Sequence, residues 1–205
     1  MLISLQARLA YLAMTKTGST AIERALRPRC NIVFSGAPEI THMTARRYQR
    51  HLVPYLTAIG ITGIETMAVL RHPVGWLASW YQYRRRAGGP DADRPESFEG
   101  FVDRYLAGET GLGRPWAFLR DQDQALGVNH LFRYEDFTAV ERFLTARFGQ
   151  EIAIKPANVS PGLDSSLPLP ALSRLESALA EEFALYDHVR DVGPLNVAGW
   201  RASGL

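Results

Sequence analysis

Short apolar runs alternate with amphipathic helical patterns along the chain, and this alternation constrains the fold more than any other feature. Four runs read as buried strands, at residues 9–14, 31–35, 66–70 and 130–134. Helical patterns, with apolar residues three and four apart, lie between them. Strands that alternate with helices favour an α/β fold with three layers, α/β/α, and a mainly parallel central sheet. We expect a single domain over residues 1–205, because this length suits one well-buried core.

Three further elements are predicted from shorter patterns. Residues 152–154 read as a minor strand, and residues 171–186 as one amphipathic helix. Thr41 or Thr44 is placed to cap a helix over residues 44–52, since a threonine oxygen can accept from the first helical amides.

The loop TKTGST, at residues 15–20, joins the first apolar run to a helix. A helix N-terminus offers backbone N–H groups and the positive end of a dipole, which together bind phosphate. Gly18 lets the backbone approach a ligand closely. Ser19 and Thr20 add hydroxyl donors, and Lys16 adds a positive charge. The same residues also suit a glycine turn with a solvated lysine, and the loop alone leaves both interpretations open.

The loop differs from the common nucleotide-binding motif. A Walker A loop has the order G-x-x-x-x-G-K followed by Ser or Thr, whereas Lys16 here precedes Gly18 by two residues. A magnesium-dependent kinase also needs an acidic residue near a strand end, but Arg71 follows the run at 66–70. Lysine occurs only at Lys16 and Lys155, among 23 Lys and Arg residues. Cations at two strand ends favour a highly anionic ligand held without a metal ion.

Two segments resemble motifs of the sulfotransferases that use 3′-phosphoadenosine 5′-phosphosulfate (PAPS). TKTGST is similar to the family's 5′-phosphosulfate loop, with Thr15 in place of the usual proline. Residues 69–81 resemble its 3′-phosphate signature, which is an apolar strand, Arg-x-Pro and a serine eight residues after the arginine. Arg71 and Ser79 have this spacing. His72 replaces the asparagine or aspartate that is frequent before the proline.

The resemblance extends along most of the chain. Residues 134–136 resemble a Tyr-Glu-Asp that follows a later strand in many members, and Asn158 and Ser160 resemble part of the C-terminal portion. The glycine-rich C-terminal signature of the cytosolic members is not clear in residues 199–204. One side of the 3′-phosphate pocket is therefore unassigned.

The resemblance implies a P-loop NTPase-like sulfotransferase fold. It also implies transfer of a sulfuryl group from PAPS to an acceptor hydroxyl or amine, with the nucleotide PAP as product and no metal. Lys16 would stabilise the leaving oxygen as a catalytic residue. The implied cofactor-binding residues are Lys16, Thr17, Gly18, Ser19, Thr20, Arg71 and Ser79. The acceptor, a small molecule or a carbohydrate, is not specified by these motifs.

An acceptor hydroxyl needs a general base, most often histidine. His42 follows the second apolar run and resembles the catalytic histidine or glutamate that some members carry in this region. Glu39 is a rival three residues earlier, and a locally hydrogen-bonded loop histidine is the alternative for His42. We expect His72 to be structural, because its neighbour Arg71 would depress its basicity.

Arg84, Arg85 and Arg86 end the helix that carries Ser79. Positive charge is favourable at a helix C-terminus by itself, and it also attracts anionic ligands. Successive helical residues cannot all face one pocket, so at least one of the three is expected to be structural. The aromatic residues of the same helix are expected to pack rather than to clamp a base.

Two alternatives and several exclusions complete the prediction. A P-loop kinase and a nucleotide-binding protein without turnover are the rival functions. The net charge of +2 gives no case for nucleic acid, and no apolar run is long enough to span a membrane. The start lacks a signal-peptide pattern, and Cys30 is the only cysteine. These features favour the cytoplasm, and they do not determine an oligomeric state.

Overall fold

The computed structural model describes residues 1–157 and 165–201 as an α/β protein. Its strands form one sheet in the order β3-β1-β2-β4-β5. The strands are β1 (Leu2–Ser4), β2 (Leu9–Tyr11), β3 (Ile32–Val33), β4 (Glu65–Leu70) and β5 (His130–Arg133). The four apolar runs that were predicted as strands therefore supply β2, β3, β4 and β5.

The sheet is mixed, so the prediction of a mainly parallel sheet was wrong. β2 pairs with β4 and β4 with β5 in parallel, whereas β1 is antiparallel to both β2 and β3. The reason is that residues 2–4 form a strand of their own. The turn that follows reverses the chain, with Arg8 at φ 49° and the Ala7 amide donating to Ser4 Oγ. A strand joined to β2 by so short a turn can only pair with it in antiparallel fashion.

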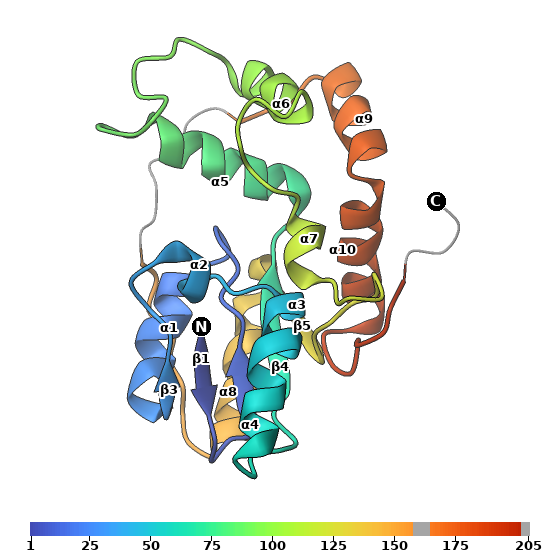
Figure 1. The fold of residues 1–205 in the computed structure, drawn as a ribbon. Helices are drawn as coiled ribbons and strands as arrows, with labels where there is room; N and C mark the ends of the chain where they lie inside the picture. The colour runs from blue at the N-terminus through green and yellow to red at the C-terminus, as the bar shows by residue number, and fades with distance from the viewer. Residues whose placement is uncertain (158–164, 202–205) are drawn as a thin grey trace.

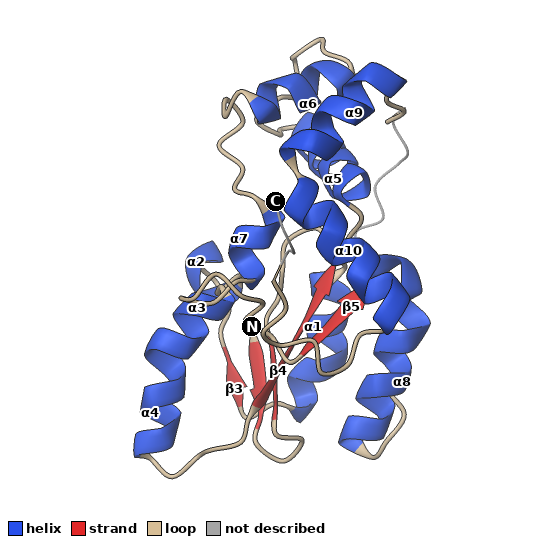
Figure 2. Cartoon of the chain, turned by 90° about the vertical axis from the view of Figure 1, so that its right-hand side faces the viewer, coloured by secondary structure: helices blue, strands red, loops and turns tan. Residues whose placement is uncertain are grey.

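Helices cover both faces of the sheet, as Figure 2 shows. They are α1 (Ser19–Leu26), α2 (Pro38–Thr41), α3 (Ala45–Arg47), α4 (Val53–Ala58), α5 (Pro73–Arg85), α6 (Phe98–Leu106), α7 (Pro115–Leu119), α8 (Phe137–Phe148), α9 (Leu169–Ala178) and α10 (Ala180–Val192). Single turns of other helix types are η1 (Arg27–Arg29), η2 (Tyr48–Leu52) and η3 (Tyr134–Asp136).

Strand alternation decides which helices cover which face. Tyr11, Val69 and Phe132 pack with α1 and α8 in one core cluster. Ala68 and Leu131 point the other way and pack with α3, α4, α7 and α10 in a second cluster. The two clusters give the protein its three layers.

A third cluster of apolar residues lies beyond the sheet. It joins α5, α6 and α9 and includes Met14, just after β2. In Figure 1 these three helices form an upper tier above the ends of β4 and β5. The upper tier therefore covers the end of the sheet where the polar motifs were predicted.

Two of the minor elements differ from the prediction. Residues 152–154 form no strand, because the amides of Ile152 and Ile154 donate to side chains of α8, Thr145 Oγ1 at 3.0 Å and Glu141 Oε1 at 2.8 Å. The helix predicted over residues 171–186 is divided at Leu179 into α9 and α10. Of the two predicted caps, Thr44 is the one that is used, since its Oγ1 accepts from the Arg47 amide, whereas Thr41 ends α2.

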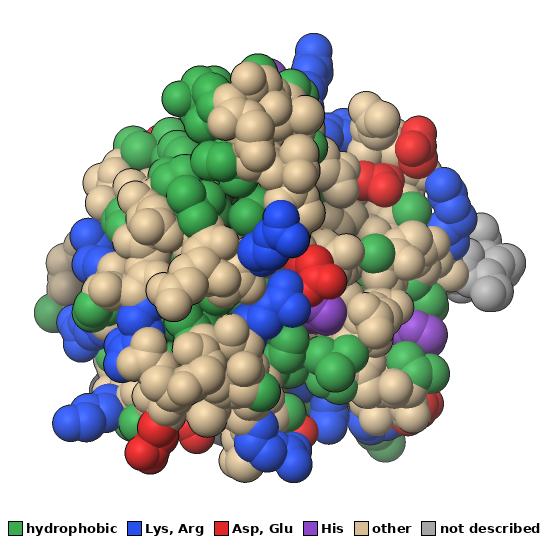
Figure 3. Space-filling view, turned by 90° about the horizontal axis from the view of Figure 1, so that it is seen from below, with side chains coloured by type: hydrophobic (Ala, Val, Ile, Leu, Met, Phe, Trp, Pro, Cys, Tyr) green, Lys and Arg blue, Asp and Glu red, His purple; other side chains and the backbone are tan. Residues whose placement is uncertain are grey.

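The opposite end of the sheet carries a group of paired charges. Glu65, at the start of β4, contacts both His130 Nε2, at 3.1 Å, and Arg147. Seen from below, basic, acidic and histidine side chains lie next to one another near the middle of the face (Figure 3). No helix in the described part of the chain is both long and apolar enough to cross a membrane.

Candidate functional site

The loop after β2 is closed by its own hydrogen bonds. The Thr17 side chain is buried, and its hydroxyl donates to the Met14 carbonyl at 2.9 Å. Lys16 and Gly18 both adopt left-handed backbone conformations, with φ of 64° and 73°. The chain then enters α1 at Ser19, and none of the described side chains caps this helix. The Thr17 hydroxyl is therefore occupied inside the loop, and only its backbone can serve a ligand.

Neighbouring side chains leave no room for a side chain at Gly18. A Cβ there would lie 2.7 Å from Phe137 Cζ and 3.3 Å from Tyr134 Cε2. Both contacts belong to the segment after β5, so the glycine lets the loop lie directly against that segment. The backbone conformation adds to the requirement, since φ near +73° is strained for any residue with a Cβ.

We expect Gly18→Ala to lower the free energy of unfolding by about 2–4 kcal/mol, from left-handed strain plus overpacking. Gly108→Ala is the matched control, because Gly108 has φ +77° and no atom of the described residues lies within 4 Å of an added Cβ. Gly108→Ala should lower the free energy of unfolding by about 1 kcal/mol, the effect of the left-handed strain alone. Urea denaturation of both variants measures the difference, and equal losses would contradict the close contact with Phe137.

Arg71 joins the ends of two adjacent strands. It follows β4, which lies beside β2, and its Nη1 donates to the Lys16 carbonyl at 3.4 Å. Its guanidinium also stacks over the Tyr134 ring, with Cζ 4.3 Å from the ring centroid. A Cβ on Gly75 would lie 3.2 Å from Arg71 Nε, so the side chain crosses α5 at the residue that leaves room for it.

Ser79 lies one helical turn beyond Gly75 and is half-buried. Residues four apart share one side of a helix, so Arg71 runs along the side of α5 on which Ser79 is found. The spacing of the 3′-phosphate signature thus corresponds to one continuous strip, from Arg71 across Gly75 to Ser79.

The Lys16 ammonium lies against aromatic side chains of α5. Its Nζ is 3.0 Å from the centroid of the Tyr83 ring and 4.6 Å from that of Trp80. Burial, together with the smaller effects of the Arg86 and Arg71 charges, lowers the pKa of Lys16 from 10.5 to about 7. Lys16 is therefore a half-buried amine with two cationic neighbours, a setting that disfavours its charged form.

We expect the free energy of unfolding to rise with pH between about 7 and 10. The folded protein releases the Lys16 proton near pH 7, whereas the ordinary pKa is 10.5. The unfolded state therefore binds more protons in this range, and stability grows as pH increases. The rise is on the order of 1 kcal/mol, because the amine is partly solvated. Urea denaturation near pH 7 and pH 9.5 should show it in the wild type and not in Lys16→Met.

The three consecutive arginines at the end of α5 have different environments. Arg84 donates to Asp91 Oδ2 at 2.6 Å and to the Thr110 carbonyl, and Arg85 donates to the Tyr81 hydroxyl and the Glu96 carbonyl. Both are used to hold the segment after the helix. Arg86 is exposed and stacks on Tyr83, with Cζ 3.7 Å from the ring centroid. Of the three arginines, Arg86 is thus the one that shares the Tyr83 ring with Lys16.

His42 directly follows α2 and is fixed against the chain just after β2, far in sequence from the loop. Its Nδ1 lies 2.7 Å from the Ala13 carbonyl. A carbonyl can only accept, so Nδ1 carries the proton, and in the neutral ring Nε2 keeps its lone pair. Glu39 is exposed on α2, and among the described residues no hydrogen bond or ion pair joins it to Lys16. In the part of the chain that the structure describes, neither candidate base forms a hydrogen bond or ion pair with the Lys16 side chain.

His72 is held by packing at the start of α5. Its ring meets Phe183 and Tyr186 edge-on, at 5.4 Å and 5.0 Å between centroids. Burial lowers the pKa of His72, while the nearby Glu135 carboxylate opposes this effect. Its packed environment fits the structural role expected for it, but burial rather than Arg71 depresses its basicity. Glu135 accepts from the His72 amide and from the Tyr186 hydroxyl, which ties the Tyr-Glu-Asp segment to α10.

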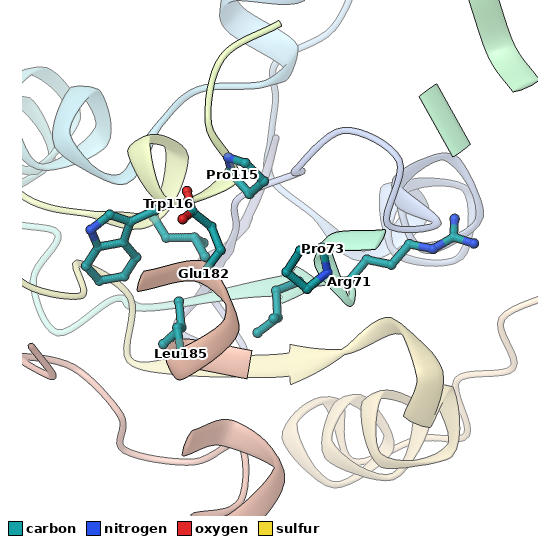
Figure 4. Close-up of a pocket in the computed structure, with 8 residues that line it drawn as sticks. Arg71, Pro73, Pro115, Trp116, Glu182 and Leu185 are labelled. Carbon is teal, nitrogen blue, oxygen red and sulfur yellow. The ribbon is translucent and has the colours of Figure 1, made fainter. Parts of the chain in front are cut away.

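A small cavity lies behind Arg71. It has a volume of about 10 Å³ and is lined by Leu70, Pro73, Trp116 and Leu185, among others. Such a volume admits about one water molecule. Figure 4 shows the Arg71 guanidinium pointing away from the other lining residues. The cavity therefore lies within the packing behind the site. The guanidinium of Arg71 lies on the side of the Lys16 loop.

Sequence reasoning did not include Trp80, Tyr83 and Tyr134 among the site residues. Trp76, Trp80 and Tyr83 occur at helical spacing i, i+4 and i+7, which also indicates one face of a helix. Trp76 donates from Nε1 to the Thr15 carbonyl at 3.0 Å, so this face meets the loop. The spacing could have shown that these aromatic residues share one face of the helix. It could not have shown that this face lies against Lys16. Asn158 and Ser160 lie outside the described residues.

The described residues contain no group of three or more His, Cys, Asp or Glu side chains able to hold a metal ion.

Comparison with known proteins assigns no family to the chain. No protein-family model matches it, and no solved structure matches it. Among curated proteins, it is similar to a 1,4-alpha-glucan branching enzyme GlgB from Rubrobacter xylanophilus, with 27% identity over 104 residues. The match covers 48% of this chain, and the chain spans only 14% of the length of that enzyme. The likeness is too partial to assign the chain to the family of that enzyme.

Proposed function

We propose that this chain is a PAPS-dependent sulfotransferase with a P-loop NTPase-like fold, acting on a small-molecule or carbohydrate acceptor in the cytoplasm. One observation carries the proposal: Arg71 from the end of β4 reaches the backbone of the Lys16 loop at the end of β2. Parallel neighbouring strands bring both motifs to the same edge of the sheet. The two segments that resemble the family's nucleotide-binding motifs therefore form one continuous surface.

The charge of this surface supports an anionic ligand. Lys16, Arg71 and Arg86 are close enough for the two arginines to depress the pKa of the lysine. Three cations gathered in a partly buried place repel one another, and a polyanion bound among them would relieve that repulsion. The indole N–H of Trp80 is buried without an acceptor among the described residues, which adds a donor beside Lys16.

Each residue has a role that its position supports. The backbone at Thr17, Gly18 and Ser19, together with the N-terminus of α1, would hold the 5′-phosphate. Arg71 would hold the 3′-phosphate through its fixed guanidinium donors, with Ser79 on the same strip of α5. PAPS supplies an activated sulfuryl group, which passes to the acceptor oxygen as the bond to the 5′-phosphate breaks. Lys16 would then balance the charge left on that phosphate.

His42 is the better candidate for the base. Its Nδ1–H is held by the Ala13 carbonyl, so the lone pair of Nε2 is available to take the acceptor proton. Glu39 lies on the exposed helix α2 and has no such positioning contact among the described residues. The variants His42→Asn and Glu39→Gln separate the two: loss of the true base lowers turnover while affinity for PAP is retained. Binding with no turnover under any acceptor would instead indicate a nucleotide-binding protein.

Calorimetric titration with PAP, with ATP plus Mg²⁺ alongside, tests the proposal directly. We expect tight binding of PAP in the presence of EDTA and little binding of ATP. Such a result would justify a screen of phenol, sugar and amine acceptors with PAPS. Magnesium-dependent binding of ATP, with PAP ignored, would move the chain to the kinase class.

A further inference from the structure

Residues 45–58 form one helical segment with a buried side and an exposed side. α3, η2 and α4 follow one another without a break, and in Figure 2 they run along one flank of the sheet. We call this segment the 45–58 helix. Ala45, Tyr48 and Leu56 are buried in a core cluster under the sheet, which fixes the orientation of the segment. Its other side faces solvent over a length of about 20 Å, from the helical rise per residue.

The exposed side of the 45–58 helix carries cations and no acidic residue. Arg46, Arg47 and Arg50 are all exposed. They are three or four residues apart across the first turns, so their guanidinium groups lie on one side of the helix. No Asp or Glu occurs between Glu39 and Glu65 in the sequence. The helix therefore has a positive side without acidic residues of its own.

The arginines of the 45–58 helix have no ion-pair partner, unlike arginines on other helices. Arg174 of α9 pairs with Asp103 at 2.9 Å, and Arg190 of α10 pairs with Asp187 at 2.6 Å. Among the described residues, no hydrogen bond or ion pair uses the side chains of the three arginines of the 45–58 helix. Asp121, which lies near the start of the helix, accepts from two backbone amides of its own turn. A negatively charged partner would therefore meet these cations without displacing an existing ion pair.

Apolar side chains are exposed on the same side of the segment. Tyr55 is 60% exposed, and Ile59, at the C-terminal cap, is 53% exposed. Arg47, His51, Tyr55 and Ile59 follow one another at intervals of four residues and are all exposed. Residues at this spacing form one row along a helix. The row therefore leads from the cationic end of the segment to an apolar end.

The combination of cations with exposed apolar residues selects the kind of partner. Phosphates of a nucleic acid would attract the arginines but leave the apolar end in water. A lipid surface suits both, because anionic headgroups attract arginine and the interfacial region accepts tyrosine and aliphatic side chains. We propose that the 45–58 helix docks the protein on an anionic lipid surface, with Tyr55 and Ile59 at the boundary between headgroups and acyl chains. Each arginine near such a surface contributes about fivefold to binding, so the docking is reversible and weakens in salt.

Co-sedimentation of the full chain with lipid vesicles tests this proposal, which does not depend on the proposed sulfotransferase activity. We expect binding to vesicles of phosphatidylcholine mixed with phosphatidylserine, weak binding to phosphatidylcholine alone, and loss of binding in high salt. The triple variant with Arg46→Gln, Arg47→Gln and Arg50→Gln should bind the mixed vesicles roughly 100-fold more weakly. Tyr55→Ser combined with Ile59→Ser should weaken binding by about tenfold, because the apolar contact with the lipid is lost.

A second triple variant is the matched control for net charge. It combines Arg142→Gln, Arg174→Gln and Arg190→Gln, at exposed positions of α8, α9 and α10, and should bind within about threefold of the wild type. An unchanged midpoint of thermal unfolding shows that each variant is folded. The proposal is overturned if this control loses as much binding as the helix variant, or if phosphatidylcholine alone binds as well as the mixture. It is also overturned if the Tyr55 and Ile59 changes have no effect while a DNA duplex displaces the vesicles, which would make a nucleic acid the partner.

Discussion

Arg71→Ala is expected to weaken the binding of PAP by roughly 30- to 700-fold, which corresponds to about 2–4 kcal/mol. The Arg71 guanidinium is held by the Lys16 carbonyl on one side and by the Tyr134 ring on the other. A charge-assisted contact from such a fixed group to a phosphate is worth more than one from a mobile surface side chain. Calorimetric titration of the wild type and the variant measures the loss without knowledge of the acceptor.

Two controls define the meaning of that loss. Arg190→Ala removes the same charge from an exposed part of α10 and should change the PAP affinity less than twofold. Arg71→Lys keeps the charge but not the planar fork, so an intermediate affinity is expected. Thermal unfolding of each variant shows whether the fold is retained. A folded Arg71→Ala protein that binds PAP normally would remove the residue from the site and with it the main support for the proposed function.

Lys16→Met should lower kcat by about 10²–10³, the usual cost of removing one group that stabilises charge in a transition state. Methionine keeps the length of the side chain and can still pack against Trp80 and Tyr83, so the loop should remain folded. Because the ammonium acts mainly on the charge that develops as the sulfuryl group leaves, affinity for PAP should change by less than tenfold. The measurement is release of PAP from PAPS, with an acceptor found by screening.

This second prediction depends on Lys16→Met lowering kcat far more than it lowers the affinity for PAP. A parallel loss of PAP affinity and kcat would mean that Lys16 only binds nucleotide. A kcat within tenfold of the wild type would mean that another group balances the charge, with Arg86 the nearest candidate because it shares the Tyr83 ring with Lys16. Arg86→Ala in the Lys16→Met background then distinguishes the two, since a substitute would show a further fall.

In the proposed reaction, Lys16 must first leave its contact with Tyr83, and the loop motif alone does not indicate this step. In the structure the ammonium lies 3.0 Å from the centre of that ring. To reach the leaving oxygen, the Lys16 side chain has to move away from the face of the Tyr83 ring. It then leaves its half-buried position and contacts the phosphate. An anionic nucleotide favours this exchange because it raises the pKa of the amine and attracts its charged form.

Local sequence patterns determined where most secondary structure lies and where the two motifs fall within it. The apolar runs that became β2, β4 and β5, and the helices α1, α5 and α8, depend on spacing and on turn residues such as Gly18 and Gly149. Periodicity and backbone conformation act over a few residues, so the sequence carries them directly. The expectation that the polar motifs follow strand ends was correct for the same reason.

Only the tertiary structure decided which of these pieces meet. Residues 2–4 became a strand because β2 and β3 offered edges on both sides, and this made the sheet mixed. Arg84 and Arg85 are engaged by the segment that folds back over α5, and Arg86 is directed to Lys16. Such contacts join residues far apart in the chain, and their energies depend on packing that local spacing does not contain.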